Sequence, residues 1–189
     1  MAGDAMFPFP GPGADVDAVV ADTMFRRRLV MARGRLDAEL AGRTVAQLLT
    51  LDALADDPID LHLDVEGDDL DAVFAVIDAI DTIGAPVRVR LAGRAGGLAV
   101  AVLAVGAERV VAPHARALVS EPVASFDGRP ESVANWAEAH RTRLADLVGR
   151  LASATGRSEG EIRQIITESA VLDAERLVAL SIADRIDVP

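Results

Sequence analysis

The chain has 189 residues, of which 51% are hydrophobic, and it carries a formal net charge of -11 at pH 7 with no cysteine. This length suffices for one domain with a sizeable core, and the acidic balance argues against a nucleic-acid partner because no basic face can neutralise phosphates. Thiol nucleophiles, zinc-thiolate sites and disulfides are excluded. The longest apolar stretch, 98–106, is too short to span a bilayer, and no signal peptide is recognisable, so we expect a cytoplasmic protein without a membrane segment.

In chain order, the apolar pattern predicts alternating helices and strands after a Pro/Gly-rich leader at 1–13. The predicted helices are 15–27, 37–54, 69–83, 95–106 and 130–154, and the predicted strands are a segment ending at 65, then 87–91, 109–112 and 117–120. Such alternation is typical of an α/β protein with a parallel sheet covered on both faces. Residues 14–189 are therefore expected to form a single domain.

A glycine-rich turn, Gly93-Arg94-Ala95-Gly96-Gly97-Leu98, follows the strand at 87–91 and opens the apolar helix predicted at 95–106. The first amides of such a helix are unpaired donors that could hold an oxyanion, and glycine lets a ligand approach the backbone closely. The same glycines could serve only close packing. A nucleophile could sit in this turn, but the turn contains none.

The order and spacing of several segments over 28–186 resemble the Clp protease proteolytic subunit, ClpP, of the ClpP/crotonase superfamily. These segments are 28–31 with 36–41, the strand 59–65 with the turn 66–69, the glycine turn, 112–116, Glu121-Pro122, 128–156, 173–175 and 182–186. The resemblance implies repeated β-β-α units wound in a spiral. It also implies a long helix that protrudes as a handle over about 130–155.

The resemblance further implies where a catalytic triad would lie, and none of its residues is retained. The position of the nucleophilic serine is matched by Gly97, that of the histidine base by Ser120, and that of the orienting aspartate by Ser169. Glycine has no side chain that can attack a substrate, and Ser120 is a hydroxyl without a base. Triad chemistry therefore cannot operate at these positions.

The implied oxyanion loop carries a fourth change. Its positions are matched by Gly67, Asp68 and Leu98, so a carboxylate stands where the family has the second of two glycines. A carboxylate would repel the negative charge that develops on the substrate oxygen during acyl transfer. This change also predicts an inactive site.

The remaining candidate residues offer no replacement chemistry. His62 lies in a strand, His114 in a turn and His140 in the middle of the long helix, and each is expected to be structural. The acidic residues at 64, 66, 68, 69 and 71 lack the ligand order of a calcium loop and are expected to be solvated. We therefore expect no metal and no cofactor.

Apolar and aromatic residues recur at steps of three and four from 130 to 154, which predicts a long amphipathic helix. The positions on its stripe include Val133, Trp136, His140, Leu144 and Leu147. By the resemblance, this handle is the element through which two seven-membered rings meet, so these residues are predicted to form an oligomer interface. An ordinary core helix is the alternative interpretation.

Contacts with partners also depart from the family. Three aromatic positions of its docking cleft for the Clp ATPase are matched by Asp60, His62 and Thr82, which argues against docking there. An arginine that helps to join the two rings is matched by Glu168. The N-terminal axial loop is replaced by Phe7-Pro8-Phe9-Pro10.

The sequence thus predicts a catalytically inactive ClpP-like subunit with a structural or regulatory role in a heptameric or tetradecameric ring, built from copies of itself or mixed with active paralogues. Two other functions remain open. An active ATP-dependent serine endopeptidase would need catalytic residues outside the matched positions. A crotonase-like acyl-CoA binder would use Gly93-x-Ala95-x-Gly97 to hold a thioester carbonyl.

Overall fold

The computed structural model describes residues 16–122 and 128–187. The helices are α1 Val16–Arg26, α2 Ala38–Leu54, α3 Leu70–Thr82, α4 Val100–Ala104, α5 Val133–Thr155, α6 Glu159–Glu168 and α7 Ala174–Ala179, with a 3-10 turn η1 Pro130–Ser132 before α5. The strands are β1 Leu29–Arg35, β2 Ile59–Gly67, β3 Val87–Gly97, β4 Glu108–Val111, β5 Arg116–Leu118, β6 Val171–Asp173 and β7 Arg185–Ile186. The helices predicted at 15–27, 37–54 and 69–83 are confirmed, whereas the predicted leader at 1–13 lies outside the described residues.

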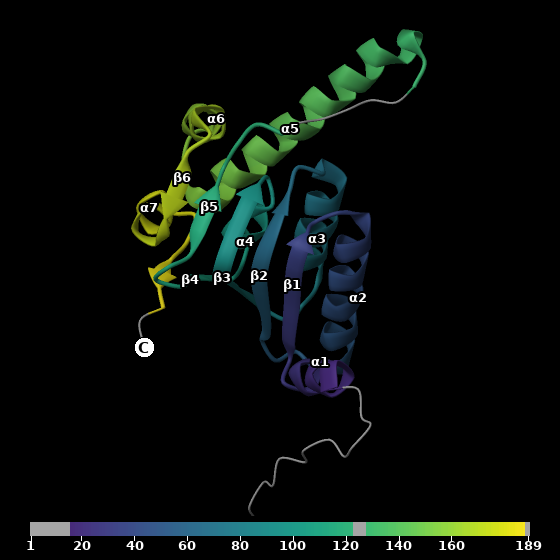
Figure 1. The fold of residues 1–189 in the computed structure, drawn as a ribbon, viewed down its shortest axis with the longest axis vertical. Coiled ribbons are helices and arrows are strands. Elements are labelled where there is room, and N and C mark those ends of the chain that lie inside the picture. Colours follow the sequence, from purple (N-terminus) through teal and green to yellow (C-terminus); the bar gives the residue numbers. More distant parts are fainter. Residues whose placement is uncertain (1–15, 123–127, 188–189) are drawn as a thin grey trace, which may run out of the picture.

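The described strands form one sheet, in which β1, β2, β3, β4 and β7 lie side by side in that order and run parallel. β5 lies beside the far end of β3 in parallel, and β6 pairs with β5 in the antiparallel direction. α2 and α3 lie together along one face, and α5 passes the end of the sheet and extends beyond it (Figure 1). The predicted α/β fold class is confirmed.

Within residues 16–122 and 128–187, only one face of the central strands is covered, which corrects the expectation of a sheet covered on both faces. On β2, Leu61 and Leu63 are buried, whereas the alternate residues Asp60 and His62 are partly exposed. On β3, buried apolar residues alternate in the same way with arginines. Because side chains alternate between the two faces of a strand, β2 and β3 present a polar outer face to solvent.

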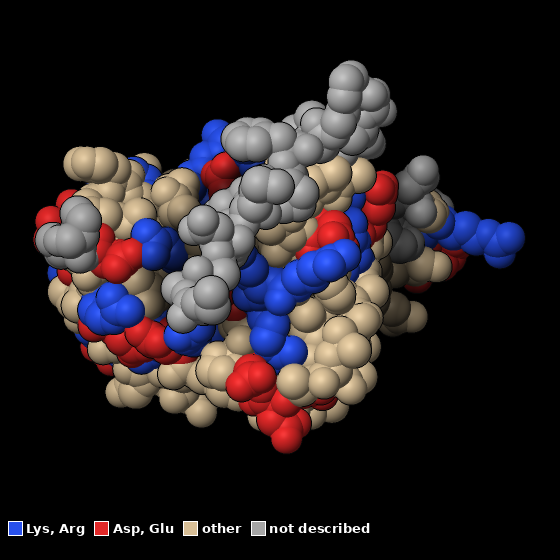
Figure 2. All heavy atoms as spheres, turned by 90° about the horizontal axis from the view of Figure 1, so that it is seen from below, with Lys and Arg blue, Asp and Glu red and all other residues tan. Residues whose placement is uncertain are grey.

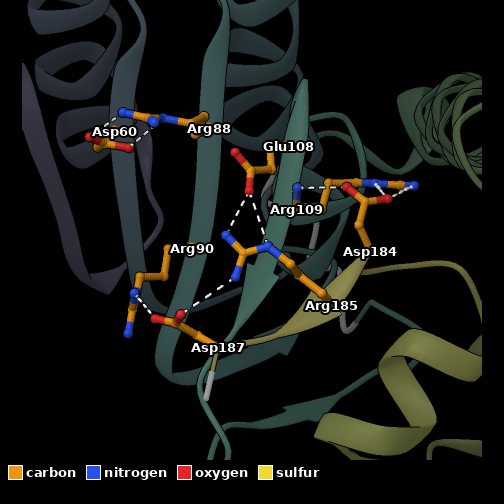
Figure 3. Close-up of polar contacts among 8 residues, drawn as sticks. All are labelled: Asp60, Arg88, Arg90, Glu108, Arg109, Asp184, Arg185 and Asp187. Atoms are coloured by element: carbon orange, nitrogen blue, oxygen red, sulfur yellow. Dashed lines mark hydrogen bonds and ion pairs between the residues drawn. The ribbon is translucent and has the colours of Figure 1, made fainter. Parts of the chain in front are cut away.

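Ion pairs lie across this outer face and link side chains of β2, β3, β4 and the segment at β7 (Figure 3). The pairs are Asp60 with Arg88 at 2.9 Å, Glu108 with Arg185 at 2.7 Å, and Asp187 with both Arg90 and Arg185. On the end of the molecule seen in Figure 2, acidic and basic side chains are likewise interspersed. The outer face is therefore polar, and its charges are paired within the chain.

β3 is longer than predicted because it does not end at the glycine turn. The register between β2 and β3 shifts after Leu63, and residues 95–97 then pair with residues 65–67. On the other side, residues 94–96 pair with β5. The helix predicted at 95–106 is consequently reduced to α4. Gly93 predicted the end of the strand, but pairing with β2 on one side and β5 on the other keeps residues 94–97 in the strand.

Arginine side chains bind the carbonyls at the ends of helices. Arg28 donates to the carbonyls of Leu51 and Ala55 at the end of α2, both at 2.9 Å. Arg157 does the same at residues 179 and 180, where α7 ends, at 2.7 and 2.8 Å. The last carbonyls of a helix have no partner within it, and a cation there also interacts favourably with the helix dipole. These contacts stabilise the ends of both helices.

Arg109 joins the sheet to the helices around it. Its side chain is 17% exposed, pairs with Asp184 Oδ1, and donates to the carbonyls of Ala154 (3.1 Å) and Ser181 (2.8 Å). The Arg109 backbone N–H donates to Asp184 Oδ2 at 2.8 Å. Burial pushes the pKa of Asp184 upward, but the hydrogen bonds and charge of Arg109 outweigh burial and hold that pKa below its ordinary value. One guanidinium therefore holds β4, the end of α5 and the segment before β7 together.

Replacing Arg109 with Met should lower the free energy of unfolding by about 2–4 kcal/mol, because buried acceptors and Asp184 lose their charged donor. The matched control is Arg88→Met, which removes a solvated pair with Asp60 and should change the free energy by no more than about 1 kcal/mol. Urea unfolding followed by circular dichroism at neutral pH measures both. Equal losses in the two variants would contradict this role of Arg109.

Candidate functional site

The pairing of β2 with β3 brings two glycine segments together at the carboxyl ends of these strands. Gly67, the last residue of β2, lies opposite Gly97, the last residue of β3. Asp68 follows directly. The next carboxylate, that of Asp69, accepts hydrogen bonds from the amides of residues 71 and 72 at 3.0 and 3.1 Å, which caps the start of α3. The matched nucleophile and oxyanion-loop positions are therefore neighbours.

The pairing of β5 with β3 and β6 brings the other two matched triad positions to the same end of the sheet. The Val119 N–H extends the antiparallel pairing of β5 with β6 by donating to the Ala170 carbonyl at 3.2 Å. Ser120 follows Val119 and Ser169 precedes Ala170, so both stand at the end of this paired segment. Gly97, Ser120 and Ser169 differ from the serine, histidine and aspartate of the family's triad.

A cavity of about 840 Å³ opens at this end of the sheet. Its lining consists of Arg35, the loop of residues 66–71, Gly96, Gly97, Leu118, Ser120, and Trp136, Ala139, His140 and Arg143 of α5. Four matched positions, 67, 68, 97 and 120, therefore share one cavity. Leu98 is not part of the lining because it is buried in the core, and Ser169 lies outside the lining as the last, left-handed residue after α6.

The amides that follow Gly97 already have an acceptor, which corrects the prediction of unpaired donors at this turn. The N–H groups of Leu98 and Ala99 both donate to the carbonyl of Gly67, at 3.1 and 3.3 Å. A substrate oxyanion would have to displace that carbonyl before it could bind these amides. The strand-to-helix turn is present, but it does not offer an open oxyanion hole.

The aromatic and basic side chains of α5 in the cavity wall interact with one another and with α3. His140 stacks on Trp136, with ring centroids 5.4 Å apart and an interplanar angle of 16°. Arg143 pairs with Asp71 at 2.8 Å and lies 4.3 Å from the centre of the Phe74 ring. None of these contacts joins a hydroxyl to a base. The sequence predicts Trp136 and His140 at an oligomer interface, and only the path of α5 shows that they also line this cavity.

α5 confirms the long helix expected at 130–154, but its apolar stripe is divided between core and surface. Leu147 is fully buried, and Leu144 packs against the core. Val133 is 48% exposed, at the end of α5 that extends away from the sheet (Figure 1). Leu147 is thus a core residue of the protomer, which corrects its prediction as an interface position. Val133, Trp136, His140 and the partly buried Leu144 remain predicted interface positions.

The three positions matched to the family's docking cleft do not come together within one chain. Asp60 and His62 lie on the outer face of β2, whereas Thr82 ends α3 on the covered side of the sheet. Asp60 is paired with Arg88. Burial first, and then the nearby Arg90, lowers the pKa of His62, against a smaller opposite effect of Asp60. His62 is therefore neutral at physiological pH.

Within the described residues, no helix combines the length and apolarity needed to cross a bilayer. In the same part of the chain, no three His, Asp or Glu side chains are grouped so that they could share a metal ion. The acidic loop of residues 66–71 has other roles, since Asp69 caps α3 and Asp71 pairs with Arg143.

Comparison with known proteins identifies the family. Residues 13–188 match the sequence pattern of the family described as Clp protease. The chain belongs to the Clp protease family. This confirms the resemblance seen in the sequence and agrees with the observed α/β fold.

Individual members of the Clp protease family match most of the chain. The ATP-dependent Clp protease proteolytic subunit 1 of Nocardia farcinica is 30% identical over 170 residues, which cover 88% of this chain and 86% of that protein. Subunit 2 of Treponema denticola is 29% identical over 179 residues, with coverages of 91% and 87%. The ATP-dependent Clp protease proteolytic subunit-related protein 2, chloroplastic, of Arabidopsis thaliana is 26% identical over 172 residues, which cover 89% of this chain and 61% of that protein.

The division of α5 predicts that substitutions along its stripe have unequal effects on stability. Leu147→Ala should lower the free energy of unfolding by about 2–5 kcal/mol because it leaves a cavity in the core. Val133→Ala, on the exposed end, should change it by less than about 0.5 kcal/mol. Urea unfolding measures both changes, at a protein concentration where the two variants have the same oligomeric state, because association would itself add to the apparent stability. A small effect at both positions would place Leu147 outside the core.

Proposed function

We propose that this Clp-family chain is a catalytically inactive subunit with a structural or regulatory role in a ring-shaped Clp-type assembly, formed by copies of itself or together with active paralogues. The observation that carries the proposal is the state of the oxyanion turn. Gly97 offers no side chain, and the Gly67 carbonyl accepts the amides of Leu98 and Ala99. Acyl transfer requires a nucleophile, a base and free donors for the oxyanion. The matched positions supply none of the three.

The hydrogen bonds from the Leu98 and Ala99 amides to the Gly67 carbonyl also weigh against a serine endopeptidase and an acyl-CoA binder. A serine endopeptidase would need free amides at this turn as well as a nucleophile and a base at other positions. An acyl-CoA binder would need the same amides to hold its thioester carbonyl. In this chain their hydrogen bonds go to Gly67. An inactive subunit is the function that leaves these hydrogen bonds intact.

The outer face of the sheet supports an assembly in which this subunit does not itself receive an apolar docking loop of a Clp ATPase. The Asp60–Arg88 pair is solvated, with side chains 36% and 44% exposed. An apolar side chain placed over it would remove the pair from water, at a cost of about 1–3 kcal/mol for each polar group left without a partner. In a mixed ring, active paralogues would provide the docking sites.

The outer part of α5 is the proposed contact between copies of the chain. It extends away from the sheet and carries Val133, which is largely exposed, and the Trp136–His140 stack, which is half-buried (Figure 1). Apolar strips of this kind are usually buried when subunits associate, and association with closed symmetry buries them in every copy. Such a contact fits rings that stack through this helix.

The purified protein should not be labelled by a fluorophosphonate probe and should not hydrolyse a fluorogenic peptide, since no matched position has a nucleophile with a base. In-gel fluorescence and intact-protein mass spectrometry measure the labelling. Stoichiometric labelling of any serine would show an active hydrolase and contradict the proposal.

A restored variant provides the positive control for this experiment. Gly97→Ser, Ser120→His and Ser169→Asp together reinstate the three triad side chains. With Asp68 retained, the carboxylate should keep labelling low, and adding Asp68→Gly should raise the labelling rate by about 10-fold or more. Equal labelling with Asp or Gly at position 68 would show that this carboxylate does not affect the site.

The assembly proposal predicts that the wild-type protein is an oligomer at micromolar concentration. Val133→Asp combined with Trp136→Asp should dissociate it without changing its circular dichroism, because both positions lie outside the core. Thr142→Asp is the matched control, since Thr142 is exposed on the opposite side of the same helix. Native mass spectrometry and light scattering measure the masses. A monomeric wild type, or equal dissociation by the control, would contradict the proposal.

A further inference from the structure

We propose that the loop at Gly67 and Asp68 fills the space that a side chain at position 97 would occupy, so that residue 68 determines whether this site can hold a nucleophile at all. The steric part of this inference depends on geometry alone, and only its catalytic consequence rests on the proposed function. On this proposal, the loop at Gly67 and Asp68 blocks the site sterically, and the site also lacks catalytic side chains.

The first observation concerns the space around Gly97. A Cβ atom at this position would lie 2.0 Å from Asp68 Oδ1, 3.0 Å from Asp68 Cγ and 2.8 Å from the carbonyl oxygen of Gly67. An ordinary van der Waals contact of a Cβ atom with a heavy atom measures 3.4–4 Å. The Asp68 carboxylate therefore occupies the position that a seryl side chain would need at residue 97.

The second observation concerns the peptide that joins Gly67 to Asp68. Its carbonyl oxygen points at the amides of Leu98 and Ala99 and accepts from both. In a planar trans peptide the N–H points opposite to the C=O. The Asp68 N–H is consequently directed away from the Leu98 amide. One matched oxyanion donor is turned away from the other, and the other is already bonded to a carbonyl.

The third observation is that the backbone of this loop is held on both sides. Gly67 pairs with Gly97 across β2 and β3, and Asp69 caps α3 through two backbone amides. Asp68 lies between these anchors, and its Oδ1 is buried without a hydrogen-bond partner among the described residues. A side chain at position 97 could therefore be accepted only if the Asp68 carboxylate is displaced and the Gly67 carbonyl also shifts.

A cycle of alanine substitutions separates this block from ordinary backbone strain. Gly97 and Gly156 have nearly the same left-handed backbone, with φ of +65° and +69°, but a Cβ at Gly156 would meet no atom within 4 Å. Gly156→Ala should raise the equilibrium constant of unfolding by about 10-fold through strain alone. Gly97→Ala should raise it by about a further 10-fold or more because of the steric overlap.

Combining Asp68→Ala with Gly97→Ala should remove most of that further increase, leaving the contribution of the Gly67 carbonyl. Asp68→Ala alone completes the cycle. All variants are unfolded in urea at one protein concentration. Equal effects of Gly97→Ala and Gly156→Ala would overturn the inference, as would additive effects of the substitutions at 68 and 97.

If Gly97→Ala does not fold, the yield of folded protein replaces the unfolding constant as the readout. Recovery of folded protein in the combined variant supports the inference, and its absence, when Asp68→Ala and Gly156→Ala both fold, overturns it. The result is independent of the labelling experiment. Labelling of the wild type would contradict the proposed function and leave the cycle unchanged, whereas an additive cycle would contradict the steric block and leave the inactivity unchanged.

Discussion

The pairing of β2 with β3 is the contact on which the site depends. Its register shift after Leu63 lets β3 continue past the first glycine of the turn, so that Gly97 ends opposite Gly67. A strand that ended at residue 91 would leave the amides after Gly97 at an open helix start. The longer strand instead delivers these amides to the Gly67 carbonyl. Backbone geometry therefore leaves neither of these two amides free to bind an oxyanion at this turn.

Contacts away from the cavity tie α5 to the sheet, and other surfaces stay polar. Arg109 connects β4 to the end of α5 and to the segment before β7. α5 then has two parts, because Leu147 is buried while Val133 is exposed. The outer face of β2 and β3 carries charged pairs instead of apolar residues (Figure 3). These features are compatible with the proposed assembly through α5, in which the outer sheet face stays in water.

Several parts of the fold follow from local sequence patterns. Asp37 and Asp69 cap α2 and α3 where the change in apolar period predicted helices to begin, because a carboxylate before a helix accepts its free amides. The strict alternation on β2 was visible in the sequence as well, but a buried parallel sheet was expected from the crossover pattern. Alternation is the stronger signal, since a strand covered on both faces is apolar at nearly every position. The polar outer face was therefore predictable from Asp60 and His62.

The sequence by itself determined the family and the α/β class, because these depend on the order and spacing of residues along one chain. Tertiary structure decided the length of β3, the division of α5 and the contacts around Gly97. Each of these depends on atoms brought together from distant segments: Gly67 with the amides of Leu98 and Ala99, and Asp68 with the space at residue 97. A glycine in a sequence indicates only that a side chain is absent, and the surrounding atoms determine whether one could fit.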